Sequence, residues 1–122
     1  MGMRIEAICI DAKDPGALGH WWAELLGWEP RADQDGDVEL HPPAGVVATP
    51  YLFAGVPDDK VVKNRLHIDL RPDDQDAEVA RAEAMGARRI DIGQGDQTWV
   101  VLADPEGNEF CILRATPPGE EA

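Results

Sequence analysis

Apolar residues recur along the chain in two similar series of strand-like and helix-like segments. Short apolar runs rich in β-branched residues, and runs in which polar and apolar residues alternate, predict strands. Apolar positions three and four residues apart predict helices, each opened by an Asp that can cap it and closed by a Gly that can end it. The pattern predicts strands at residues 5–11, 28–32, 37–41, 49–54, 65–71, 87–92, 97–103 and 109–114, and helices at 14–26 and 74–85.

The order strand, helix, three strands occurs twice, which indicates an internal duplication. Asp14 and Asp74, which open the two helices, stand 60 positions apart. Gly27 and Gly86, which close them, stand 59 apart. This agreement in spacing predicts two copies of one structural unit.

We therefore expect an α+β fold of two tandem βαβββ modules. Their strands would form a curved, cup-like mixed sheet with the helices outside, and a concave, partly apolar surface is where small ligands bind. A chain of 122 residues has the usual length of one domain. The expected divisions are a single domain over 1–122, with module one at about 4–57, module two at about 64–115 and a polar tail at 116–122.

The charge of the chain limits its partners. With 24 acidic and 11 basic residues, the net charge is -13, and such a surface repels nucleic acid and anionic membranes. No apolar run approaches the roughly 20 residues that a membrane span needs. The first residues lack the basic head and apolar stretch of a secretory signal. Cys9 and Cys111, each inside an apolar run, are therefore expected to be reduced core thiols of a cytoplasmic protein.

The strand at 65–71 carries the first candidate chemistry. Because side chains alternate along a strand, its two faces separate polar from apolar residues. The polar face holds His67, Asp69 and Arg71, and the apolar face, expected to meet the helices, holds Leu66, Ile68 and Leu70. If the last strand is its neighbour, Glu109 comes within reach of His67. Such a pair can bind a divalent metal, move a proton, or serve only as a structural ion pair.

Aromatic and polar residues elsewhere are candidate ligand contacts. Trp28 and Trp99 would form aromatic walls, although core packing is the alternative for both. His41 would lie at the rim of the cup, and Arg71 would face into it. The chain has no Gly-rich phosphate loop, no Ser and no zinc-finger spacing.

Two segments resemble a known family. The stretch 98–111, TWVVLADPEGNEFC, resembles the closing hairpin of the vicinal oxygen chelate superfamily, which includes glyoxalase I, bleomycin-resistance proteins, fosfomycin-resistance enzymes and extradiol dioxygenases. The stretch 64–74, NRLHIDLRPDD, is similar to the opening strand of the second module in a glyoxalase-like subgroup. The resemblance covers residues 4–115 and implies the same duplicated fold.

The resemblance also implies where a metal would bind. Metal-using relatives take ligands from the first and last strands of each module, which corresponds to His67 and Glu109 in module two. The corresponding places in module one hold Ala7 or Ile8 and Thr49 or Pro50, none of which is a normal metal ligand. Two protein ligands are fewer than the usual three of a catalytic site. We therefore expect no resident cofactor, with zinc, nickel, manganese or iron as the alternative.

Three functions follow from these observations. The favoured one is a small-molecule-binding protein of bleomycin-resistance type, acting as a homodimer with its ligand in the cup. The second is a divalent-metal-dependent lyase, isomerase or dioxygenase of glyoxalase type that uses His67 and Glu109. The third is a metal-free acid/base enzyme with Glu109 or Asp69 as the base.

Overall fold

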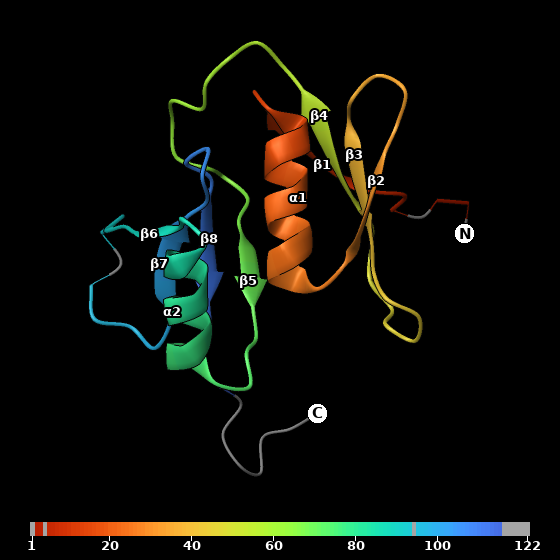
Figure 1. Cartoon of the computed structure of the whole chain (residues 1–122). Coiled ribbons are helices and arrows are strands. Elements are labelled where there is room, and N and C mark those ends of the chain that lie inside the picture. The colour runs from red at the N-terminus through yellow and green to blue at the C-terminus, as the bar shows by residue number, and fades with distance from the viewer. Residues whose placement is uncertain (1, 4, 94, 116–122) are drawn as a thin grey trace. The chain divides into compact units, whose positions relative to one another are not determined.

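Each predicted helix is present and is followed by three strands. In the computed structural model, which describes residues 2–3, 5–93 and 95–115, the chain divides into two compact units, Met1–Asp59 and Lys60–Ala122. Unit 1 contains β1 (Ile8–Ala12), α1 (Pro15–Leu26), β2 (Glu29–Ala32), β3 (Val38–His41) and β4 (Tyr51–Gly55). Unit 2 contains β5 (Ile68–Leu70), α2 (Gln75–Ala84), β6 (Arg88–Arg89), β7 (Val100–Ala103) and β8 (Glu109–Ile112), as Figure 1 shows. The predicted pair of βαβββ modules is confirmed.

Both units have the same sheet topology. The strand order is β1-β4-β3-β2 in unit 1 and β5-β8-β7-β6 in unit 2. In each unit the first and last strands pair in parallel, and the other neighbours pair antiparallel. A parallel pair needs a long crossover connection, and each crossover here contains the helix and two strands. The identical order supports the duplication that the sequence spacing predicts.

In unit 1, α1 covers one face of the sheet. Asp14 caps the helix through a hydrogen bond that Oδ1 accepts from the Ala17 N–H at 3.0 Å, and Gly27 ends it with a φ of 73°. This left-handed conformation is one that glycine adopts at little cost. The apolar stripe of α1 packs on alternate residues of β3 and β4, and the buried side chains are Leu18, Trp22, Leu25, Val38, Leu40 and Phe53.

In unit 2, α2 has a thinner apolar face than α1. Asp74 caps it through the Ala77 N–H at 3.1 Å, and only Val79 and Ala82 within the helix are buried. The apolar core of the unit therefore comes mainly from the sheet, through Leu102, Phe110 and Ile112.

The turn between β7 and β8 is organised by one buried carboxylate. Asp104 is 1% exposed, and its Oδ1 accepts hydrogen bonds from the Glu106 and Asn108 N–H groups at 2.9 Å each. The Asn108 side chain donates to Asp104 Oδ2 at 3.0 Å. The predicted hairpin is confirmed, and its polar core fixes where β8 begins.

Several local expectations are wrong. The strand expected at 65–71 is reduced to β5, and the one at 87–92 to two residues, because few backbone groups there find a ladder partner. Leu66, expected to face a helix, precedes β5 and is 89% exposed. Cys9, expected in the core, is exposed, because the face of β1 that meets α1 carries Ile10 and Ala12. The tail at 116–122 lies outside the described residues.

None of the helices in the described ranges is long and apolar enough to cross a bilayer.

A close approach between α1 and β3 gives a stability prediction. A Cβ added to Gly19 would lie 2.7 Å from Val38 Cβ, so Gly19→Ala should force the helix away from the sheet and destabilise unit 1 by about 1–3 kcal/mol. Gly16→Ala in the same helix is the control, because its Cβ would meet only Asp14 Oδ1 at 3.6 Å. Urea unfolding followed by far-ultraviolet circular dichroism measures both, and equal midpoints for the two variants would contradict this packing.

Candidate functional site

The parallel pairing of β5 and β8 brings the candidate polar residues of unit 2 together. Its register places Asp69 opposite Cys111, and directly paired residues project from the same face of a sheet. His67 precedes β5 by one residue and shares the alternation of Asp69. The predicted neighbourhood of the first and last strands is therefore present.

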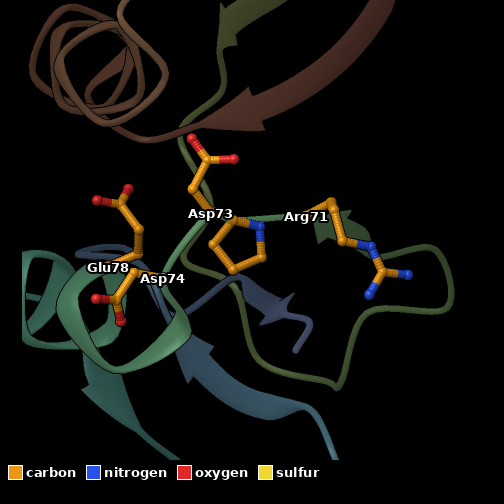
Figure 2. A pocket seen from close by; sticks show the side chains of 5 residues that line it. Arg71, Asp73, Asp74 and Glu78 are labelled. Carbon is orange, nitrogen blue, oxygen red and sulfur yellow. The ribbon is translucent and has the colours of Figure 1, made fainter. Parts of the chain in front are cut away.

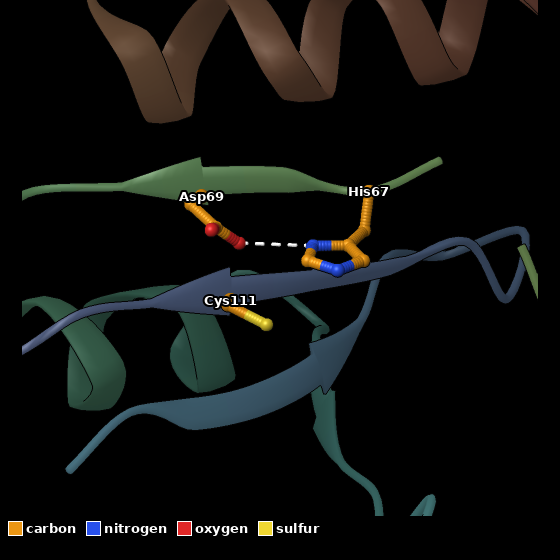
Figure 3. A group of neighbouring side chains, drawn as sticks. All are labelled: His67, Asp69 and Cys111. Atoms are coloured by element: carbon orange, nitrogen blue, oxygen red, sulfur yellow. Dashed lines mark hydrogen bonds and ion pairs between the residues drawn. The ribbon is translucent and has the colours of Figure 1, made fainter. Parts of the chain in front are cut away.

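His67, Asp69 and Cys111 form one cluster. His67 Nδ1 lies 2.9 Å from Asp69 Oδ1, and one ligand atom of each residue lies within 4.8 Å of the others. Figure 3 shows the imidazole and the carboxylate reaching from the β5 strand toward β8, which carries the thiol. The side chains of His67 and Asp69 are 44% and 47% exposed, whereas Cys111 is buried. The thiol thus forms the floor of the cluster and the other two groups form its rim.

The thiol of Cys111 is a poor nucleophile. Burial, followed by the negative charge of Asp69 and a hydrogen bond to it, raises the Cys111 pKa to about 11, although the Lys63 ammonium opposes the shift. At neutral pH the sulfur therefore keeps its proton, and a thiolate is the form that attacks substrates. A nucleophilic Cys–His–Asp triad needs the thiolate, which this environment disfavours.

Glu109 is occupied by different partners. Its Oε1 accepts a hydrogen bond from Lys60 Nζ at 2.9 Å, and its Oε2 accepts one from the Asn64 N–H at 2.9 Å. Burial by itself would raise the Glu109 pKa, but the bonds from Lys60 and Asn64 together outweigh it and lower the pKa below 4.5. Glu109 is thus an ionised carboxylate whose charge is balanced by the Lys60 ammonium, and it is a weak base.

Arg71 lies at a pocket near the start of α2. Its Nη1 donates to the Arg114 carbonyl at 2.7 Å, and the pocket is otherwise lined by Pro72, Asp73, Asp74 and Glu78. In Figure 2 the guanidinium lies on one side and the three carboxylates on the other. These carboxylates would repel an anion, which a helix N-terminus otherwise attracts. The pocket does not include His67 or Asp69.

The remaining predicted residues lie in other parts of the two units. In unit 1, Trp28 packs against Tyr51 with ring centroids 5.5 Å apart, and His41 Nε2 pairs with Glu39 at 2.6 Å. In unit 2, Trp99 is half-buried directly before β7. The described structure thus joins His67 with Asp69 and places Glu109 in a separate ion pair.

Sequence reasoning missed three residues of this neighbourhood. The expected burial of Cys111 is confirmed, but the sequence analysis does not connect this thiol with His67, and it names neither Lys60 nor Asn64 as a candidate. The alternation that links Glu109 to Cys111 along β8 was a usable signal for the thiol. No local pattern indicates that Lys60 folds back onto a strand 49 residues later.

The family is shown by a match over most of the sequence. The model of a glyoxalase-like domain family matches residues 7–113. The chain belongs to this glyoxalase-like domain family, within the vicinal oxygen chelate superfamily. No curated protein matches it.

Solved structures of low sequence identity share its fold. A glyoxalase/bleomycin resistance protein/dioxygenase family enzyme from Burkholderia phytofirmans is 19% identical, with a TM-score of 0.67 over 90% of this chain and 97% of its own. A bleomycin resistance determinant encoded on the transposon Tn5 is 15% identical, with a TM-score of 0.59 over 89% and 95%. TnmS3, an antibiotic binding protein from a Streptomyces species, is 19% identical, with a TM-score of 0.61 over 94% and 98%.

In this glyoxalase-like chain, the residues at the metal positions that the family resemblance implies are poor metal ligands as a set. His67 and Glu109 stand one residue before the first paired positions of β5 and β8. In unit 1, the same place relative to β1 and β4 is held by Ala7 and Pro50. Neither has a metal-binding side chain, and a metal at Glu109 would have to displace the Lys60 ammonium. The residues present therefore do not fit a metal at these family positions.

The Lys60–Glu109 pair predicts a pH-dependent stability. Since the folded pKa of Glu109 is lowered, its stabilisation is complete above the unfolded value near 4.5 and is lost as the pH falls through the folded pKa. At pH 7, Glu109→Gln should cost about 1–3 kcal/mol, because it leaves a partly buried ammonium without its countercharge. The difference from the unchanged protein should disappear in strong acid.

Urea midpoints measured between neutral and strongly acidic pH check this. Glu106→Gln is the matched control, since it removes a carboxylate from the turn next to β8. A Glu109→Gln deficit that persists undiminished at the lowest pH would show that the pair is not the cause.

Proposed function

We propose that this chain is a small-molecule-binding protein of the bleomycin-resistance kind, which holds its ligand without transforming it. The observation that carries the proposal is that the Glu109 carboxylate is already bound by groups of the protein itself. Its carboxylate is ion-paired with Lys60 and hydrogen-bonded by the Asn64 N–H, which makes it unsuited to act as a metal ligand or a general base. Two solved structures of the same fold support the proposal, because one is a bleomycin resistance determinant and the other an antibiotic binding protein.

The two enzymatic alternatives are less well supported. A glyoxalase-type metalloenzyme that uses His67 and Glu109 would need a donor set that unit 1 does not supply. A metal-free enzyme with Glu109 as its base would work with a lowered pKa, whereas catalytic bases are usually tuned toward neutral pH. Asp69 is hydrogen-bonded to His67, so we assign it to ligand contact.

Charge indicates the class of ligand. The net charge of -13 attracts cations and repels anions. His67 and Asp69 offer exposed hydrogen-bonding groups on unit 2, and half-buried Trp99 offers an aromatic surface. We therefore propose a planar aromatic ligand that carries a positive charge, with Asp69 as its counterion. The two free thiols fit a reducing, cytoplasmic location.

A thermal-shift series in buffer with a chelator tests this function. A cationic aromatic antibiotic such as bleomycin, at one hundred times its Kd, should add about 2.7 kcal/mol of stability and raise Tm by several degrees. An anionic aromatic compound should have no effect. Asp69→Asn should weaken binding at least about tenfold, the scale of one charge-assisted contact, while Asp35→Asn, which removes the same charge from a turn in unit 1, should not. Mass spectrometry should recover the ligand unchanged; a chemically altered ligand would reject sequestration.

A homodimer is the proposed assembly. Closed twofold pairs are the commonest arrangement among soluble oligomers, and exposed apolar side chains such as Val47, Val61 and Val62 offer surface to cover. Light scattering at micromolar concentration should give twice the 13.3 kDa chain mass. Val62→Asp should shift the chain to a monomer if this segment forms the contact, and a monomer mass for the unchanged chain would contradict the assembly.

A further inference from the structure

The cluster at β5 and β8 contains a donor set different from the one at the family's metal positions. Asp69 and Cys111 are register partners, two positions further along the strands than His67 and Glu109. With Glu109 held by Lys60 at 2.9 Å, the groups that converge are an imidazole, a carboxylate and a thiol. The cluster therefore lies further along the paired strands than the family's metal positions. His67 belongs to both sets of donors.

The chemistry of these three donors selects a class of cation. Nitrogen and sulfur ligands favour zinc and similar transition metals over magnesium or calcium, which prefer oxygen alone. Three protein ligands with an open fourth position are typical of reactive zinc sites, whereas structural sites use four. A cation here would therefore keep one position for water or for a donor atom of a small molecule.

The geometry is close to what such a cation needs. Ligand atoms bound at about 2.0–2.3 Å in a tetrahedral arrangement lie about 3.5 Å apart, and the three atoms here already lie within 4.8 Å of one another. Cys111 is fixed in β8 between two paired strands. The side chains of His67 and Asp69 are nearly half exposed, so they can turn the remaining distance toward the sulfur.

We propose that His67, Asp69 and Cys111 form a binding site for one divalent transition cation of the zinc class, with a fourth position open. On binding, the Cys111 sulfur forms a bond to the cation and its proton passes to solvent. The Lys63 ammonium acts on the thiol electrostatically and therefore opposes the incoming cation. This site goes beyond small-molecule binding. It shares Asp69 with the proposed organic-ligand contact, but the metal-free protein can bind the cation when no organic ligand is present.

Cobalt titration of the metal-free, full-length protein tests the site. Co²⁺ alone is the probe, because its thiolate complexes absorb in the near ultraviolet and its four-coordinate complexes give strong visible bands. We expect one equivalent of Co²⁺ to produce both signals and Zn²⁺ to abolish them. Cys111→Ser should remove the near-ultraviolet band, and Cys9→Ser, which removes the exposed thiol of unit 1, should retain it.

Two further variants test the site without disturbing a buried residue. His67→Gln changes an exposed side chain and should weaken cobalt binding by at least roughly tenfold. Lys63→Ala should tighten binding, an effect that a purely structural role of the cluster would not produce. The proposal is overturned if stoichiometric Co²⁺ gives no thiolate band, if Cys9→Ser removes that band, or if His67→Gln binds cobalt as tightly as the unchanged chain. Circular dichroism of each variant confirms that it is folded.

Discussion

The parallel pairing of the first and last strands is the constraint on which both units depend. In unit 2 this pairing joins residues 68–70 to residues 110–112, across a crossover that contains the helix and the other two strands. The register decides which side chains share a face. With Asp69 opposite Cys111, the apolar partners Ile68, Phe110 and Leu102 all project to the opposite face, where α2 can cover them. If β5 shifted by one residue against β8, its side chains would exchange faces, and Asp69 would no longer lie beside Cys111.

Electrostatics divides the polar neighbourhood of unit 2 into two parts with opposite behaviour. Glu109 meets an ammonium and a backbone N–H, which stabilise its charged form and lower its pKa. Cys111 meets a carboxylate in a buried position, which destabilises its charged form and raises its pKa. Both residues lie on β8, two positions apart, yet one is held ionised and the other neutral. This difference separates a structural ion pair from a cluster whose carboxylate and imidazole remain nearly half exposed.

The two units share a topology but have diverged in where their stability and chemistry lie. In unit 1 a large apolar helix face buries Leu18, Trp22 and Leu25, and the strand positions that correspond to His67 and Glu109 hold Ala7 and Pro50. In unit 2 the helix contributes only Val79 and Ala82 to the core, and the polar cluster is present. A duplicated fold therefore provides the same framework twice and leaves each copy free to keep or lose its site.

The sequence by itself determined the elements, their order and the duplication. Local patterns suffice for these, since capping by Asp14 and Asp74, termination at Gly27 and the buried turn at Asp104 act within a few residues of chain. Alternation also placed His67 and Asp69 on one face. Only the tertiary structure decided the partners of Glu109, because Lys60 approaches it from 49 residues away. The tertiary structure also decided the burial of Cys111 and the exposure of Cys9, which have similar apolar neighbours in sequence. Burial and ion pairing depend on which segments pack together, and no local pattern encodes that choice.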